Sequence, residues 1–233
     1  MTETLLLFPG LLNDARLWRD QIVALEGRVR PVVADFSQDD SLDAMVARTL
    51  ATVEGPFSLA GLSMGGYAAL ALMRLAPQRV TRLALFDTSA RADTPLEHRR
   101  RRGLMALAAR SRFMGVTPRL LPRLVAPEHL NDAGLCEDVV AMAGRVGRDA
   151  FLRQERAIMG RPDSRPGLGA ISVPTLVAVG AADAVTPLEL AEELAEGIPG
   201  ALLRVIPEAG HLPPMETPLT VNELFRAWLD GIL

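Results

Sequence analysis

Lysine is absent from this chain of 233 residues, and all 25 of its basic residues are arginine. Without lysine the chain cannot form a Schiff base with a substrate or supply the lysine of a phosphate-binding P-loop. Cysteine occurs once, at Cys136. A single cysteine excludes an internal disulfide and a zinc site built on several cysteines. The chemistry of this protein therefore depends neither on lysine nor on a cysteine cluster.

Long apolar runs are also missing, since no stretch approaches the roughly 20 residues that a membrane helix needs. The N-terminal Met1–Thr4 has no basic residue, and the apolar run at Leu5–Phe8 is too short for a signal peptide. The net charge is −3, which argues against a nucleic-acid partner. We therefore expect a soluble, cytoplasmic protein that binds neither nucleic acid nor membranes, and leave a homodimer open.

Apolar residues make up 49% of the chain, enough to bury the core of one large domain or of a domain with an insertion. Short strand-like runs alternate with helical patterns in both halves. The predicted strands are Leu5–Phe8, Arg30–Ala34, Phe57–Ala60, Val80–Phe86, Thr175–Val179 and Leu202–Ile206. The helices between them are Trp18–Leu25, Ser41–Val53, Met64–Leu75, Pro187–Ala195 and Pro218–Leu229. This alternation predicts a doubly wound α/β domain with a parallel sheet.

Residues 91–165 interrupt the alternation, because they contain helical patterns and no strand. The expected helices are Leu96–Ala109, Pro118–Leu124, Asn131–Val146 and Ala150–Met159. This segment carries 15 arginines against nine acidic residues, although the whole chain is acidic. We interpret residues 91–165 as a helical cap, or lid, inserted into a core made of residues 1–90 and 166–233.

The stretch Gly61-Leu62-Ser63-Met64-Gly65 matches the pattern G-x-S-x-G and lies between a predicted strand and a predicted helix. In that setting the pattern is typical of a sharp turn that exposes a nucleophilic serine. The glycines are needed because larger side chains would collide with the turn. We therefore predict Ser63 as the nucleophile, against the alternative of a merely tight turn.

A serine hydroxyl needs a base, and the chain has three histidines. His98 lies beside a run of arginines and His129 within the cap, whereas His211 follows the last predicted strand. His211 is thus expected at the same sheet edge as Ser63. A carboxylate must orient the histidine, and Asp183 follows the fifth strand. Asp87 ends the fourth strand and is the competing candidate.

The oxyanion of an acyl-transfer reaction needs two backbone donors. We expect one from the N–H of Met64, directly after the nucleophile. The other is expected from Leu11, in the loop Phe8-Pro9-Gly10-Leu11-Leu12 after the first strand, where Gly10 permits close approach of the backbone.

The sequence resembles the α/β-hydrolase superfamily in four stretches. Two are the loop after the first strand and the turn around Ser63, given above. The other two are Gly-Ala-Ala-Asp-Ala-Val-Thr-Pro around Asp183 and Gly-His-Leu-Pro-Pro-Met-Glu-Thr-Pro around His211. The resemblance covers nearly the whole chain and implies the fold, a Ser63-Asp183-His211 triad and a helical cap. The chain departs from the family at Pro9, where many members have histidine. It also begins at the third strand of the family's sheet, so the leading β-hairpin is absent and the sheet should be wholly parallel.

The expected activity is cleavage of a small carboxylic ester or thioester through an acyl-enzyme on Ser63, with a small acyl substrate as partner and no metal or organic cofactor. Alternatives on the same triad are carbon–carbon bond hydrolysis and a lyase of the type found in menaquinone biosynthesis. A ligand receptor without turnover is an alternative from another class. The run Arg99–Arg102 has two interpretations. It forms a solvated helix face, or one of its arginines, or Arg91, pairs with a substrate carboxylate or phosphate.

Overall fold

Six parallel strands form one sheet in the computed structural model, which describes residues 2–232. The spatial order is β2-β1-β3-β4-β5-β6, and each neighbouring pair is parallel. The strands are β1 (Glu3–Phe8), β2 (Val29–Val33), β3 (Phe57–Leu62), β4 (Val80–Phe86), β5 (Thr175–Gly180) and β6 (Leu202–Ile206). The predicted doubly wound parallel sheet is therefore confirmed.

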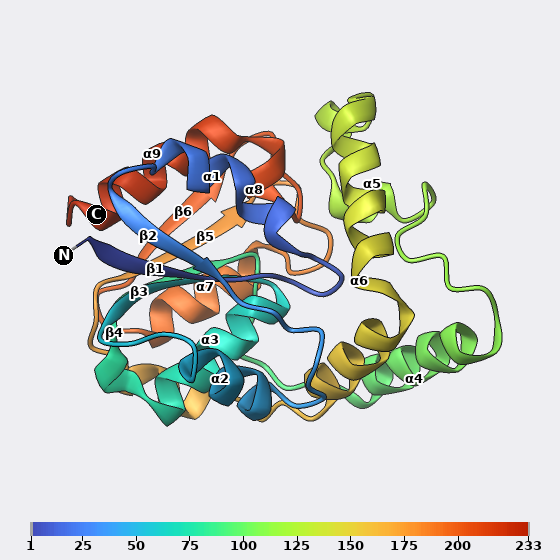
Figure 1. Ribbon diagram of the computed structural model, residues 1–233, viewed down its shortest axis with the longest axis horizontal. Coiled ribbons are helices and arrows are strands. Elements are labelled where there is room, and N and C mark those ends of the chain that lie inside the picture. The colour runs from blue at the N-terminus through green and yellow to red at the C-terminus, as the bar shows by residue number, and fades with distance from the viewer. Residues whose placement is uncertain (1, 233) are drawn as a thin grey trace.

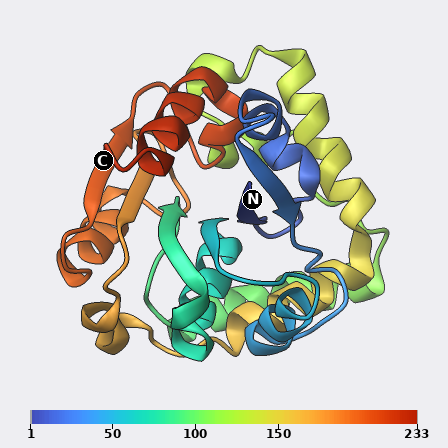
Figure 2. The same ribbon diagram turned by 60° about the vertical axis from the view of Figure 1, so that its left-hand side comes forward.

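Successive residues of each strand point to opposite sides of the sheet, so both faces carry apolar side chains. Helices cover both faces. In β1, Leu6 and Phe8 enter one apolar core, and Leu5 and Leu7 enter the other. The first core packs against α2 (Leu42–Leu50), α3 (Met64–Leu75) and α7 (Leu188–Gly197). The second packs against α1 (Arg19–Ala24) and α9 (Pro218–Leu229), on the opposite side in Figure 1. Figure 2, turned so that the N-terminus comes forward, also shows helices around the sheet.

Between β4 and β5 the chain leaves the sheet and forms a helical cap. Its helices are α4 (Pro95–Arg110), α5 (Leu121–Leu124) and α6 (Ala133–Met159), with a 3-10 turn at Pro127–His129. In Figure 1 the cap stands on the side toward which the strand arrows point, and both chain ends lie on the other side. The cap thus faces the carboxyl ends of the strands.

The two helices expected over 131–159 are the two halves of α6, divided by a kink at Gly147, whose φ of +77° only glycine adopts readily. Other local expectations differ from the structure. The helix expected over 118–124 is reduced to the single turn of α5, and the one expected over 18–25 divides into a 3-10 turn (Ala15–Trp18) and α1. Two further 3-10 segments span Pro77–Arg79 and Arg165–Ala170. The prolines after His211 begin a short helix, α8 (Pro213–Glu216), because proline suits the first helical position.

A search of residues 2–232 for a helix with the length and apolarity to cross a membrane finds none.

Candidate active site

Ser63 occupies a strained turn that joins β3 to α3. Its φ of +55° and ψ of −116° lie outside the regions that L-residues favour, at a cost of about 1–3 kcal/mol. A Cβ atom on Gly61 would lie 2.4 Å from the carbonyl oxygen of Gly65, and one on Gly65 would lie 2.2 Å from that of Phe8. Both positions therefore require glycine. The close packing brings the start of α3 against the end of β1 and leaves the Ser63 hydroxyl facing a cavity.

Two hydrogen bonds connect Ser63, His211 and Asp183. His211 Nε2 is 2.9 Å from Ser63 Oγ, and His211 Nδ1 is 2.9 Å from Asp183 Oδ2. The three residues follow β3, β6 and β5, whose carboxyl ends share one edge of the sheet. Because an ionised carboxylate only accepts hydrogen bonds, Nδ1 donates to Asp183 and Nε2 of the neutral ring can accept from Ser63.

The other two histidines lie in the cap, away from this chain of hydrogen bonds. His98 is on α4, and His129 ends the 3-10 turn after α5. The Nε2 atom of His129 is 2.8 Å from the carbonyl oxygen of Glu208. Of the three histidines in the sequence, His211 is the one that contacts Ser63.

Asp183 is buried and well supplied with donors. Its Oδ1 accepts hydrogen bonds from the N–H groups of Val185 and Thr186 at 2.7 and 3.1 Å, and its Oδ2 accepts one from the Thr186 hydroxyl at 2.6 Å. Burial alone would raise the pKa of Asp183, but His211 and these donors outweigh burial and lower the pKa below its usual range. Asp183 therefore stays ionised next to the imidazole.

Asp87, the competing carboxyl, is buried at the end of β4 but has a different set of contacts. Its Oδ1 accepts the Gly180 N–H at 2.8 Å, and its Oδ2 has no hydrogen-bond partner within the described part of the chain. Burial, and then the charge of Asp183, raise the pKa of Asp87 well above its usual value. Asp87 thus retains its proton to a higher pH than an exposed aspartate does.

One ligand atom from each of Asp87, Asp183 and His211 falls within 4.8 Å of the other two, a grouping that a metal ion could in principle use. The chemistry of the donor set does not fit this role. His211 Nδ1 and Asp183 Oδ2 already bind each other through a proton, and burial favours the protonated form of Asp87, whereas metal ligands must be deprotonated.

The loop after β1 lies on the other side of Ser63 and is fixed by a cap residue. Leu12 has a φ of +60°, and its N–H donates to Gln154 Oε1 of α6 at 3.0 Å. Gln154 Nε2 in turn donates to the Phe36 carbonyl at 3.2 Å. No hydrogen bond occupies the N–H of Leu11 or Met64 within residues 2–232. The N–H groups of Leu11 and Met64, the expected oxyanion donors, are therefore free to bind a ligand. Gln154 is a residue that sequence reasoning missed.

Glu216 is a second missed residue, and it holds the loop that carries His211. Its buried carboxylate accepts three backbone N–H groups, from Ala126, Gly210 and Leu212, at 2.7, 2.9 and 2.8 Å. Burial raises the pKa of Glu216, partly offset by these donors. In addition, the His211 N–H donates to the Leu124 carbonyl at 2.9 Å. The His211 loop is thereby joined to the base of the cap. The signal in the sequence that could have identified Glu216 is its position five residues after His211.

The cavity that Ser63 and His211 face has a volume of about 700 Å³ and extends under the cap. Apolar side chains of the cap line it together with five arginines: Arg91, Arg100, Arg101, Arg123 and Arg161. A cavity with apolar walls and a few polar groups suits a small organic molecule.

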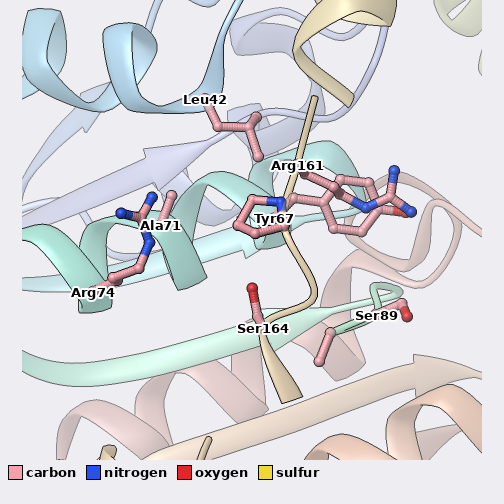
Figure 3. A pocket seen from close by; sticks show the side chains of 9 residues that line it. Leu42, Tyr67, Ala71, Arg74, Ser89, Arg161 and Ser164 are labelled. Carbon is pink, nitrogen blue, oxygen red and sulfur yellow. The ribbon is translucent and has the colours of Figure 1, made fainter. Parts of the chain in front are cut away.

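Ion pairs hold the walls of this cavity together on the side of α3. Asp93 contacts Arg101 at 2.7 Å and Arg161 at 2.6 Å, and Arg101 also contacts Glu155 at 2.9 Å. The Arg161 guanidinium lies 4.2 Å from the centre of the Tyr67 ring, a cation–π contact that is visible in the close view of Figure 3. These contacts attach the cap to the helix that follows Ser63.

Comparison with known proteins agrees with this architecture. The profile of the Alpha/beta hydrolase family matches residues 5–224. The chain therefore belongs to the alpha/beta hydrolase family.

Individual relatives include esterases. A pimeloyl-[acyl-carrier protein] methyl ester esterase of Neisseria meningitidis serogroup A is 27% identical over 206 residues, which are 86% of this chain and 65% of that protein. The chain thus spans just under two thirds of the length of that relative. A thermophilic esterase from Thermogutta terrifontis, solved with malate bound, superposes with a TM-score of 0.89 at 32% identity and covers 99% of this chain and 92% of the other. The enol-lactonase from Burkholderia xenovorans LB400 shares the fold, with a TM-score of 0.85 at 22% identity over 99% and 92% of the two chains.

Proposed function

We propose that this protein is a serine hydrolase that cleaves a small carboxylic ester or thioester through an acyl-enzyme on Ser63. The observation that carries the proposal is the unbroken chain of hydrogen bonds from Ser63 Oγ through His211 to Asp183 at the edge of a cavity. Membership of a family whose relatives include named esterases supports the same conclusion.

Each step of this reaction uses a group that the chain supplies. Ser63 Oγ attacks the acyl carbon while His211 Nε2 takes the hydroxyl proton. The negative charge on the acyl oxygen is stabilised by the N–H groups of Leu11 and Met64. His211 then gives its proton to the departing alcohol or thiol, which leaves the acyl group on Ser63.

Deacylation repeats the sequence with water in place of the Ser63 hydroxyl. His211 removes a proton from the water, the hydroxide attacks the acyl-enzyme, and Ser63 recovers its proton as the carboxylic acid is released. Asp183 stabilises the imidazolium in both halves of the reaction and holds the ring in the tautomer that the attack requires. The reducing cytoplasm suits such an enzyme, since its one cysteine forms no internal disulfide.

A fluorophosphonate probe tests this proposal, because it reacts with activated serines. We expect one label on Ser63, and none after Ser63→Ala. The control variant is Ser172→Ala, which removes an exposed serine before β5. Turnover of aryl esters and acyl thioesters of graded length is measured on the same variants. Labelling that survives Ser63→Ala would contradict the site, and a labelled protein without turnover would instead indicate a receptor.

A further inference from the structure

The five arginines that line the cavity fall into two groups. Arg101 and Arg161 are neutralised by Asp93 and Glu155, as described above, and Arg91 pairs with Glu193 of α7 at 2.9 Å. These three side chains serve the structure of the protein. The sequence offered Arg91 and the run Arg99–Arg102 as possible partners of a substrate anion. Arg91 and Arg101 are excluded from that role because these ion pairs occupy them.

Arg100 and Arg123 form the second group, because neither makes an ion pair or a side-chain hydrogen bond with any residue of the described chain, 2–232. They come from different elements of the cap, α4 and α5, and both line the cavity that contains Ser63. Partial burial, followed by the like charges of Arg123 and Arg101, lowers the pKa of Arg100. Both side chains therefore add positive charge to the same cavity.

The acidic residues of the cap offset only part of this positive charge. Glu97 and Glu155 both act on Arg100, but Glu97 accepts the Thr94 N–H at 2.6 Å in the capping box of α4, and Glu155 is bound to Arg101. Glu189, the remaining carboxylate of the cavity wall, belongs to α7 and not to the cap. Two arginines without an ion-pair partner in one cavity suit an oxyanion, because the guanidinium fork matches a carboxylate or phosphate.

We propose that Arg100 and Arg123 bind an anionic group of the substrate, a carboxylate or a phosphate, in the cavity that Ser63 faces. This inference rests on the proposed function, since it specifies the class of ester that Ser63 cleaves. The substrate then has two ends: an acyl carbon at Ser63 and an oxyanion under the cap, with a chain between them that contacts the apolar wall.

The test compares esters that differ only in charge. One series consists of the mono-p-nitrophenyl esters of dicarboxylic acids of graded length, and its neutral counterpart is the p-nitrophenyl esters of fatty acids of equal length. A second pair, acyl-pantetheine thioesters with and without the terminal phosphate, distinguishes a phosphate from a carboxylate. We expect kcat/KM to favour the anionic member of at least one pair, and added salt to reduce this preference.

The variants are Arg100→Gln and Arg123→Gln, with Arg99→Gln and Arg102→Gln as matched controls. The controls remove the same charge from exposed positions of α4 that do not line the cavity. Loss of one charge-assisted contact should raise KM for the anionic ester about 10- to 100-fold. Values of kcat, and all constants for the neutral ester, should stay unchanged, as for a group that binds ground state and transition state equally.

Failure of this inference is distinguishable from failure of the proposed function. If neutral and anionic esters are cleaved equally well, or if the four variants act alike, the anion site is wrong while the hydrolase remains. If no ester is cleaved, the proposed function falls, and calorimetry with Ser63→Ala still measures whether the anionic ester binds more tightly than the neutral one. Equal binding of the two esters in that experiment would overturn the anion site as well.

Discussion

Asp87 and Asp183 place two carboxyl groups beside the same imidazole, but only Asp183 forms a hydrogen bond with His211. The two residues end neighbouring strands, β4 and β5, of a parallel sheet, which explains why the sequence offered both as candidates. The structure separates them by their contacts. Asp183 is an ionised acceptor with several donors, whereas Asp87 has a raised pKa and an oxygen without a hydrogen-bond partner in the described chain.

The ranking of the two carboxyls can be measured directly. Asp183→Asn should lower kcat by roughly 10⁴, because the amide no longer selects the required tautomer of His211 or stabilises the imidazolium. Asp87→Asn should lower kcat far less, since the Asp87 side chain does not contact His211 by hydrogen bonding. Steady-state kinetics on both variants measure the two values of kcat. A larger loss for Asp87→Asn than for Asp183→Asn would show that Asp87, at the end of β4, is the carboxylate that orients His211.

Asp87 also gives a prediction for stability against pH. Its pKa is raised in the folded protein, so the folded state binds the proton more tightly than the unfolded chain does. As the pH rises from the unfolded pKa of about 3.9 to the raised folded pKa, this group lowers the free energy of unfolding. Asp87→Asn keeps an acceptor for the Gly180 N–H but cannot ionise.

We therefore expect the Asp87→Asn variant to gain stability over the wild type as the pH rises through that window. Urea denaturation at a series of pH values, on both proteins, gives the comparison. A constant difference in unfolding free energy across the series would show that Asp87 ionises as freely in the folded protein as in the unfolded chain.

Glu216→Gln tests the carboxylate that collects three backbone N–H groups. An amide offers one oxygen in place of two, so at least one buried charge-assisted hydrogen bond is lost, at a cost of about 1.5–3 kcal/mol. The His211 loop should loosen at the same time, and kcat should fall more than KM rises. Glu223→Gln, an exposed change on α9, removes the same charge and is the control. Equal stability of the two variants in urea would contradict this role.

Gln154→Met tests the link between the cap and the loop after β1. Methionine has a similar volume but accepts no strong hydrogen bond, so the Leu12 N–H loses its buried partner, at a cost of about 1–3 kcal/mol. The neighbouring Leu11 N–H is then less well held, and we expect kcat to fall about tenfold or more with little change in KM. Gln78→Met, in an exposed turn, is the control. A rise in KM alone would assign Gln154 to substrate binding.

The sequence predicted the sheet because its four central strands are largely buried on both faces and read as short apolar runs between amphipathic helices. It predicted the surroundings of Ser63 because the glycines of the turn are a local steric requirement. Gln154 could not be found in this way, since its partners Leu12 and Phe36 lie 142 and 118 residues away in the chain. Glu216 binds its neighbours Gly210 and Leu212, but its link to the cap depends on Ala126, which is 90 residues away. The pairing of the cap arginines depends likewise on distances that only the folded chain defines.

Helix boundaries show the same limit of local patterns. The helix expected over 118–124 shortens to the single turn of α5, and the one expected over 18–25 divides into a 3-10 turn and α1. The prolines after His211 begin the short helix α8, which carries Glu216. These boundaries depend on packing against the rest of the chain as well as on the local residues.

The hydrogen bonds from the His211 loop to Leu124 and Ala126 restrict how substrate can enter. Leu124, the last residue of α5, and Ala126 are hydrogen-bonded to His211 and Glu216. A hinged opening of the cap at this end would break these bonds or carry the imidazole away from Ser63. Movement of α4 and residues 111–120 would leave the imidazole in place, so we expect substrate to enter on that side of the cavity.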